Sequence, residues 1–136
     1  MVKIDILYEG DLHCSLTHGP SGAKISTDAP KDNHGKGEAF SPTDLIAAAL
    51  GSCMLTTMGI YAGKQGINLK GAKAEVTKEM VQDPIRRIGR LTAHFHFPSG
   101  IAQEARAVLE RVALACPVSK SLHGDVRIEV DFIYPD

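Results

Sequence analysis

The segment from Ser41 to Gly66 constrains the fold more than any other part of this chain. Ser41 and Pro42 are typical of a helix N-cap and first turn, and Gly66 is suited to end a helix. Between these residues, apolar side chains occur on nearly all sides of the predicted helix. Such a helix belongs in the interior of a protein or at an interface, because none of its sides is suited to water.

Alternating apolar and polar residues predict β-strands on both sides of this helix. The clear patterns cover residues 2–8, 72–77, 91–97 and 126–134, and weaker ones cover 12–16 and 23–27. Together with the strand at 2–8, the two weaker patterns predict a β-meander in the N-terminal third of the chain. A second helix is predicted from Ser99, with an apolar stripe that runs to Cys116 and would cover a sheet. The order of elements predicts an α+β fold with an antiparallel sheet, in a single domain over residues 1–136.

Composition and charge narrow the range of partners. The chain has 15 Lys and Arg against 16 Asp and Glu, so its formal charge of -1 creates no strong field for nucleic acid or anionic lipid. The N-terminus lacks the continuous apolar core of a signal peptide, and the apolar stretch 45–50 is too short to cross a bilayer. We therefore expect a cytoplasmic protein that binds neither nucleic acid nor membrane. The three cysteines are odd in number, in a chain too large to need disulfides for stability, so we do not expect a structural disulfide framework.

Cys53 and Cys116 are the candidate reactive residues, and both lie on predicted helices. Cys53 sits about three turns into the apolar helix, too far from its N-terminus for the helix dipole to stabilise a thiolate appreciably. Taken alone, this residue fits a small core side chain better, since free cysteine is commonly buried. Cys116 precedes Pro117, which is suited to start a helix whose backbone N–H groups would favour a thiolate. Its position on an apolar stripe fits a packing role equally well.

Other residues able to bind metals or react carry weaker signals. Cys14 lies in a predicted strand with no motif around it, and we interpret it as structural or incidental. His94 and His96 share one face of a predicted strand, but no third ligand has the spacing of a metal site. We therefore expect no metal centre.

Two motifs surround the candidate cysteines. The first runs Ser-Pro-Thr-Asp-Leu at 41–45 and continues as Ala-Ala-Leu-Gly-Ser-Cys at 48–53, and the second is Cys-Pro-Val-Ser-Lys-Ser-Leu at 116–122. Together they resemble the OsmC family of osmotically inducible and organic-hydroperoxide-resistance proteins. The Tyr-Glu-Gly at 8–10, the Asp-Ala-Pro at 28–30 and the closing strand are also similar to family features.

This resemblance implies a fold, a partner and a chemistry. The implied fold is OsmC-like, with antiparallel sheets packed around long central helices in an intertwined homodimer whose active sites are made by both chains. The implied activity is that of a thiol peroxidase. In it Cys53 attacks a hydroperoxide, Cys116 resolves the sulfenic acid to a disulfide, and a dithiol supplies the electrons. Neither a metal nor an organic cofactor is required.

Two positions differ from the family pattern. The family's peroxidases carry a glutamate directly after the helix-starting proline, where this chain has Thr43 followed by Asp44. They also use an arginine from the N-terminal region, whereas the first arginine here is Arg86. Lys24, His13 or an arginine of the partner chain would have to supply that positive charge. Two functions stay open: a hydroperoxide reductase in oxidative stress defence, or a non-catalytic protein that binds a small apolar or thiol-bearing ligand in the dimer cleft.

Overall fold

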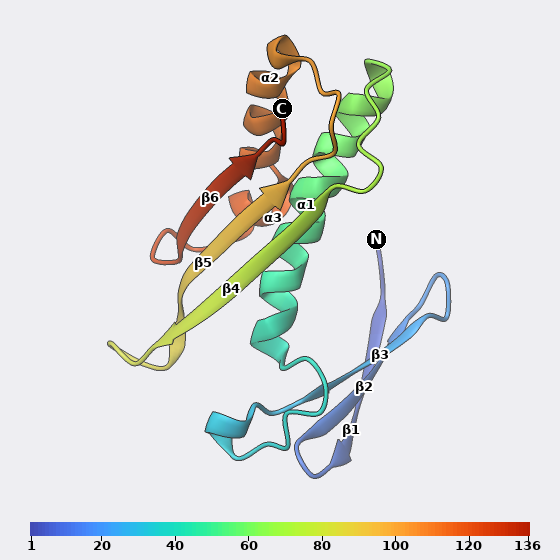
Figure 1. The fold of residues 1–136 in the computed structure, drawn as a ribbon. Coiled ribbons are helices and arrows are strands. Elements are labelled where there is room, and N and C mark those ends of the chain that lie inside the picture. The colour runs from blue at the N-terminus through green and yellow to red at the C-terminus, as the bar shows by residue number, and fades with distance from the viewer. The chain divides into compact units, whose positions relative to one another are not determined.

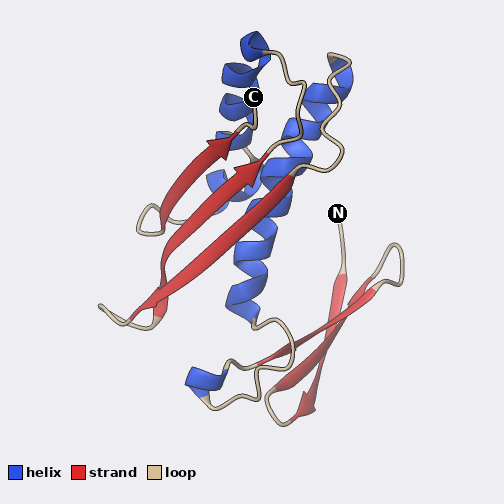
Figure 2. Ribbon diagram, in the orientation of Figure 1, coloured by secondary structure: helices blue, strands red, loops and turns tan.

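The computed structural model describes residues 1–136, which form an α+β fold (Figures 1 and 2). In chain order the elements are β1 (Ile4–Gly10), β2 (His13–His18), β3 (Lys24–Asp28), the 3-10 helix η1 (Lys31–Asn33), α1 (Pro42–Lys64), β4 (Lys73–Val81), β5 (Arg87–His96), α2 (Gln103–Leu114), α3 (Pro117–Ser121) and β6 (Arg127–Ile133). Contacts divide the chain into two compact units, Met1–Ile46 and Ala47–Asp136, and we describe each by itself. The α+β class is confirmed, while the single domain over 1–136 stays a prediction.

The unit Met1–Ile46 contains the predicted meander. Its strands form an antiparallel sheet in the order β1-β2-β3. Cross-strand pairing places apolar residues of all three strands on one face, because directly opposed residues point to the same side. They include Ile4, Ile6, Tyr8, Leu16 and Ile25. Ile6 is 65% exposed and Ile25 is 55% exposed, so the other residues of the unit Met1–Ile46 leave this apolar face uncovered.

A capping box starts α1 at the residue that the sequence predicts. The Ser41 hydroxyl accepts a hydrogen bond from the Asp44 backbone N–H at 3.0 Å, and the Asp44 carboxylate accepts one from the Ser41 N–H at 2.9 Å. Two N–H groups that the first helical turn would leave unpaired are therefore satisfied reciprocally. Pro42 occupies the first helical position, where its missing N–H is not needed.

The unit Ala47–Asp136 contains a second sheet in the order β4-β5-β6. The pairing of β4 with β5 is antiparallel, as predicted, but β5 and β6 pair in parallel, which corrects the expectation of a purely antiparallel sheet. The reason lies in the connection: residues 97–126 contain α2 and α3, and a helical crossover returns the chain to the same end of the sheet. In Figure 1 the chain leaves β5, passes through α2 and α3, and then enters β6.

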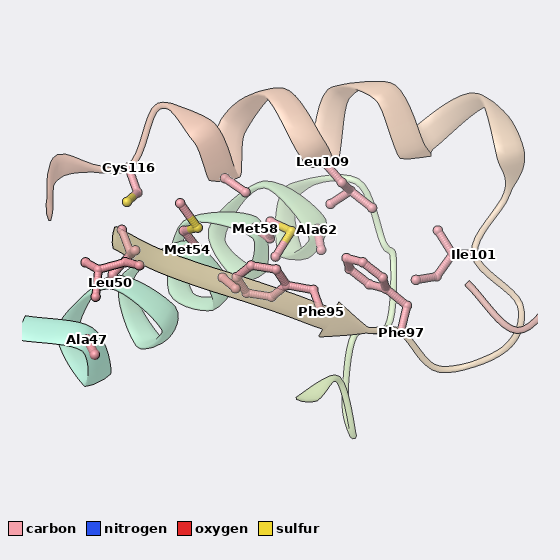
Figure 3. Close-up of a cluster of buried hydrophobic side chains, with 13 residues drawn as sticks. Ala47, Leu50, Met54, Met58, Ala62, Phe95, Phe97, Ile101, Leu109 and Cys116 are labelled. Atoms are coloured by element: carbon pink, nitrogen blue, oxygen red, sulfur yellow. The ribbon is translucent and has the colours of Figure 1, made fainter. Parts of the chain in front are cut away.

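The core of this unit lies between α1, α2 and the second sheet (Figure 3). The buried residues of α1 recur at helical spacing, so one stripe of the helix faces the core: Ala47, Leu50, Gly51, Met54, Met58 and Ala62. Leu91, Phe95 and Leu109 are also fully buried in the cluster. At Gly51 the helix approaches β4 so closely that a Cβ atom would lie 2.8 Å from Cγ2 of Val76.

By length and composition alone, α1 could cross a membrane. It has 23 residues, and the mean hydropathy of its most apolar window is 1.6. The apolar segment is therefore longer than the stretch 45–50 that the sequence alone indicates. Core helices have the same properties, and the buried stripe of α1 packs into the cluster described above. We therefore describe α1 as a core helix.

Candidate functional site

Cys116 is the N-cap residue of α3, the short helix that follows α2. Its Sγ atom accepts a hydrogen bond from the Ser119 backbone N–H at 3.4 Å, and its carbonyl accepts one from the Ser119 hydroxyl at 2.9 Å. The side chain has no exposed surface and belongs to the core cluster. Figure 3 shows it directed from the junction of α2 and α3 toward that cluster. The fold therefore gives this thiol an apolar surrounding and one N–H donor.

Cys53 lies in the middle of α1 and is half-buried. It packs against the same core cluster that contains Cys116. The Thr57 hydroxyl donates to the Cys53 carbonyl at 2.8 Å, which fixes the threonine side chain on the next turn of the helix. Both cysteines are free thiols. The fold thus brings two residues that are 63 positions apart in the sequence to one cluster, and their roles in chemistry stay a prediction.

The predicted supporting residues lie in the other unit. Thr43 and Asp44 are in the first turn of α1, where the Asp44 carboxylate completes the capping box. Lys24 is the first residue of β3, is exposed, and pairs across the sheet with Thr17. These three belong to Met1–Ile46, whereas both cysteines belong to Ala47–Asp136. Their support of the cysteines stays a prediction.

The first sheet contains a histidine–carboxylate pair that the sequence patterns did not predict. The His13 ring contacts the Asp28 carboxylate, with Nδ1 and Oδ1 2.5 Å apart. This hydrogen bond raises the pKa of His13, and the same contact lowers the pKa of Asp28. The residues lie opposite each other on β2 and β3. The register of the β2–β3 hairpin, counted back from the turn at 19–22, would have predicted that these two residues pair.

The other sequence candidates have ordinary surroundings. Cys14 pairs across the sheet with Tyr8 and Thr27. The His94 Nδ1 atom lies 3.0 Å from the Asp131 carboxylate on the neighbouring strand. No group of three or more His, Cys, Asp or Glu side chains in residues 1–136 is arranged to hold a metal ion.

Comparison with known proteins identifies the family. The sequence profile described as OsmC-like protein matches residues 35–131, which is more than half of the chain. The chain belongs to this family. The match includes both cysteine motifs and the capping box at the start of α1.

Solved structures agree with this OsmC-like assignment. A crystal structure of a candidate osmotic-stress-induced and detoxification-response protein from Psychrobacter arcticus is 44% identical, has a TM-score of 0.92, and aligns over 98% of this chain and 96% of that one. An organic hydroperoxide resistance protein OsmC from Legionella pneumophila is 20% identical, has a TM-score of 0.77, and aligns over 97% and 96% of the two chains, which shows the fold alone. An uncharacterised protein of Acinetobacter baylyi is 24% identical over 89% of this chain and 91% of its own length.

Proposed function

We propose that this OsmC-like protein is a thiol-dependent hydroperoxide reductase in which Cys53 attacks the substrate and Cys116 resolves the product. The observation that carries the proposal is the packing of both cysteines against one core cluster, in a chain of this family. Their difference in exposure supports the order of the two roles. Cys53 is half-buried and retains exposed surface, whereas Cys116 has none, so a hydroperoxide would meet Cys53 first.

The proposed reaction has three steps. The Cys53 thiolate attacks one oxygen of the hydroperoxide ROOH, the O–O bond breaks, and after proton transfer the products are Cys53 sulfenic acid and the alcohol ROH. The Cys116 thiol, as its thiolate, then attacks the sulfenic sulfur, which forms the S–S bond and releases water. A dithiol reductant finally reduces this disulfide by thiol–disulfide exchange and is itself oxidised to a disulfide.

The same proposal includes a homodimer in the cytoplasm that acts in oxidative stress defence. Two apolar surfaces of the chain support a second copy as the partner. One is the uncovered face of the first sheet, and the other is the outer side of α1, where Ile60 is 59% exposed. A second copy would remove both surfaces from water. Light scattering at micromolar concentration tests the dimer, and a stable monomer would contradict it.

A peroxide consumption assay tests the activity. Cumene hydroperoxide and hydrogen peroxide are each supplied with dihydrolipoamide or dithiothreitol as reductant. We expect turnover that is lost in Cys53→Ser, severely reduced in Cys116→Ser and retained in Cys14→Ser, which controls for the loss of any one thiol. Non-reducing peptide mapping after mild peroxide treatment should find Cys53 joined to Cys116 within one chain. Turnover that survives Cys53→Ser, or a disulfide through Cys14, would contradict the proposal.

A second function, non-catalytic binding of a small ligand, has one observation in its favour. A hollow of about 320 Å³ with an almost wholly apolar lining lies in the unit Met1–Ile46, on the apolar face of the first sheet. Its lining residues are Ile4, Leu16, His18, Ala23, Ile25 and Leu45. If no hydroperoxide is consumed with any dithiol while a small apolar or thiol-bearing molecule raises the melting temperature, this binding function replaces the first proposal.

A further inference from the structure

The His13 side chain lies between two carboxylates from different parts of the first sheet. Its Nδ1 atom is 2.5 Å from Oδ1 of Asp28, and its Nε2 atom is 3.6 Å from Oε1 of Glu9. Only a protonated imidazole presents a hydrogen at both ring nitrogens. Loss of one proton therefore leaves a nitrogen lone pair facing a carboxylate, so this arrangement suits the charged ring.

The Asp28 carboxylate also holds the segment that leads into α1. While Oδ1 contacts His13, Oδ2 accepts a hydrogen bond from the Glu38 backbone N–H at 3.1 Å. The Asp28 N–H in turn donates to the Phe40 carbonyl at 3.1 Å. Phe40 directly precedes Ser41, the residue that caps α1. One carboxylate thus ties β2 and β3 to residues 29–40, and through them to the first turn of the helix.

Water and protons can reach this contact through an open hollow. The hollow has a volume of about 400 Å³ and is lined mainly by polar residues, among them His13, Asp28 and Ser26. The other charged groups that line it are Glu9 and Asp11 near the turn between β1 and β2, and Lys36 and Glu38 from the segment 29–40. The His13 side chain retains 37% exposure, whereas the Asp28 side chain retains 9%. The group that exchanges protons is therefore the exposed member of the pair.

We propose that His13, Asp28 and Glu38 form a proton-operated clasp that fixes the segment 29–40 on the first sheet, and that loss of the His13 proton loosens this segment. The four acidic residues Glu9, Asp11, Asp28 and Glu38 line the same hollow, and Lys36 is then the only positive charge among its lining residues. Repulsion among the acidic residues favours movement of the segment, because it carries Glu38. The proposal concerns the first unit alone and does not depend on peroxidase activity.

The direction of the pH dependence follows from the two shifts. The pKa of His13 is raised, chiefly by its hydrogen bond to Asp28, so the clasp is complete at mildly acidic pH and loosens as pH rises through the pKa of the folded protein. The pKa of Asp28 is lowered, chiefly by His13, so the clasp is also lost at strongly acidic pH. Between these limits the segment is held.

A pH titration followed by two-dimensional NMR tests the clasp. Above the strongly acidic range in which Asp28 gains a proton, we expect the backbone amide signal of Glu38 to shift in a transition whose midpoint equals that of the His13 ring protons. This comparison needs only the wild-type chain, so it does not depend on the folding of a variant. In His13→Gln the Glu38 transition should disappear, and in Asp28→Asn the His13 midpoint should move to lower pH.

The control is His18→Gln, which removes another histidine of β2. The His18 Nδ1 atom contacts the Ser21 hydroxyl at 2.6 Å and no carboxylate, so this variant should retain the Glu38 transition unchanged. The proposal is overturned if the Glu38 amide does not titrate with His13 in the wild-type chain. It is equally overturned if the same transition persists in folded His13→Gln.

Discussion

Replacement of Gly51 by alanine tests how closely α1 must approach the second sheet. Gly51 is buried in the middle of the helix, and a Cβ atom there would lie 2.8 Å from Cγ2 of Val76 and 3.8 Å from Cβ of Ala74. Carbon atoms that are not bonded normally approach to about 3.5 to 4.0 Å, so the first contact overlaps by about 0.7 to 1.2 Å. Val76 is β-branched and cannot easily turn its methyl group away.

Two opposing terms set the expected magnitude. Alanine favours a helix interior over glycine by about 1 kcal/mol. Overpacking of a well-filled core costs about 1 to 3 kcal/mol. The net loss for Gly51→Ala is therefore about 0 to 2 kcal/mol. With about 2.1 cal/mol/K of unfolding entropy per residue and 136 residues, each kcal/mol lowers the melting temperature by about 3 to 4 °C.

Thermal unfolding of a small set of variants, at one protein concentration, isolates the contact. In Gly59→Ala, where nothing lies within 4 Å of the added Cβ, the melting temperature should rise by about 3 °C, because only the helix term of about 1 kcal/mol remains. In a Val76→Ala background, which removes Cγ2, Gly51→Ala should also stabilise by about 1 kcal/mol. A stabilisation of the wild-type chain by Gly51→Ala as large as that by Gly59→Ala would show that Val76 does not restrict position 51.

Three further predictions concern the cap, the C-terminal tyrosine and the ion pair. Ser41→Ala should lower the free energy of unfolding by about 1 kcal/mol, whereas Ser41→Gly should lower it by only a few tenths, as measured by urea denaturation. The phenol of Tyr134 donates to the Glu110 carboxylate at 3.1 Å and burial raises its pKa, so one tyrosine should ionise well above pH 10 in an absorbance titration, and Tyr134→Phe should abolish that late transition. The stability difference between the wild-type chain and His13→Gln should be greatest near pH 5 to 6. It should fall at higher pH as His13 loses its proton, and at lower pH as Asp28 gains one. A difference that does not depend on pH would contradict the ion pair of His13 with Asp28.

Local sequence signals were sufficient for the start of α1 and for the approximate strand positions, whereas α2 begins at Gln103 and not at the predicted Ser99. Ser41 and Pro42 marked the start of α1, and Gly66, with a positive φ of 69°, follows its last residue Lys64 by two positions. These signals are reliable because capping and glycine geometry depend on neighbouring residues only. Local signals could not predict that β6 runs parallel to β5. Alternation reveals which residues share a face, but it is identical for parallel and antiparallel strands.

The parts of the candidate site that depend on neighbouring residues in the sequence were predictable, and the rest was not. Cys53 lies on the predicted helix, whereas Cys116 lies between α2 and α3 as the N-cap residue that Pro117 indicates. Their packing against one cluster depends on how α1, α2 and the second sheet meet, which no local pattern encodes. The contact of His13 with Asp28 depends on strand register, and register in turn depends on the length of the turn between β2 and β3.

The parallel pairing of β5 with β6 has a consequence for the order of folding. The β4–β5 hairpin closes over residues 82–86, whereas β6 joins β5 only after closure of residues 97–126. For loops of about 5 and 30 residues, the difference in closure entropy is about 1.6 kcal/mol against the second event. We therefore expect the hairpin to form first and β6 to arrive late. Phe132, which stacks on Phe95 and packs against the core cluster, reaches that position only then, so we expect the cluster to be completed at the final stage of refolding.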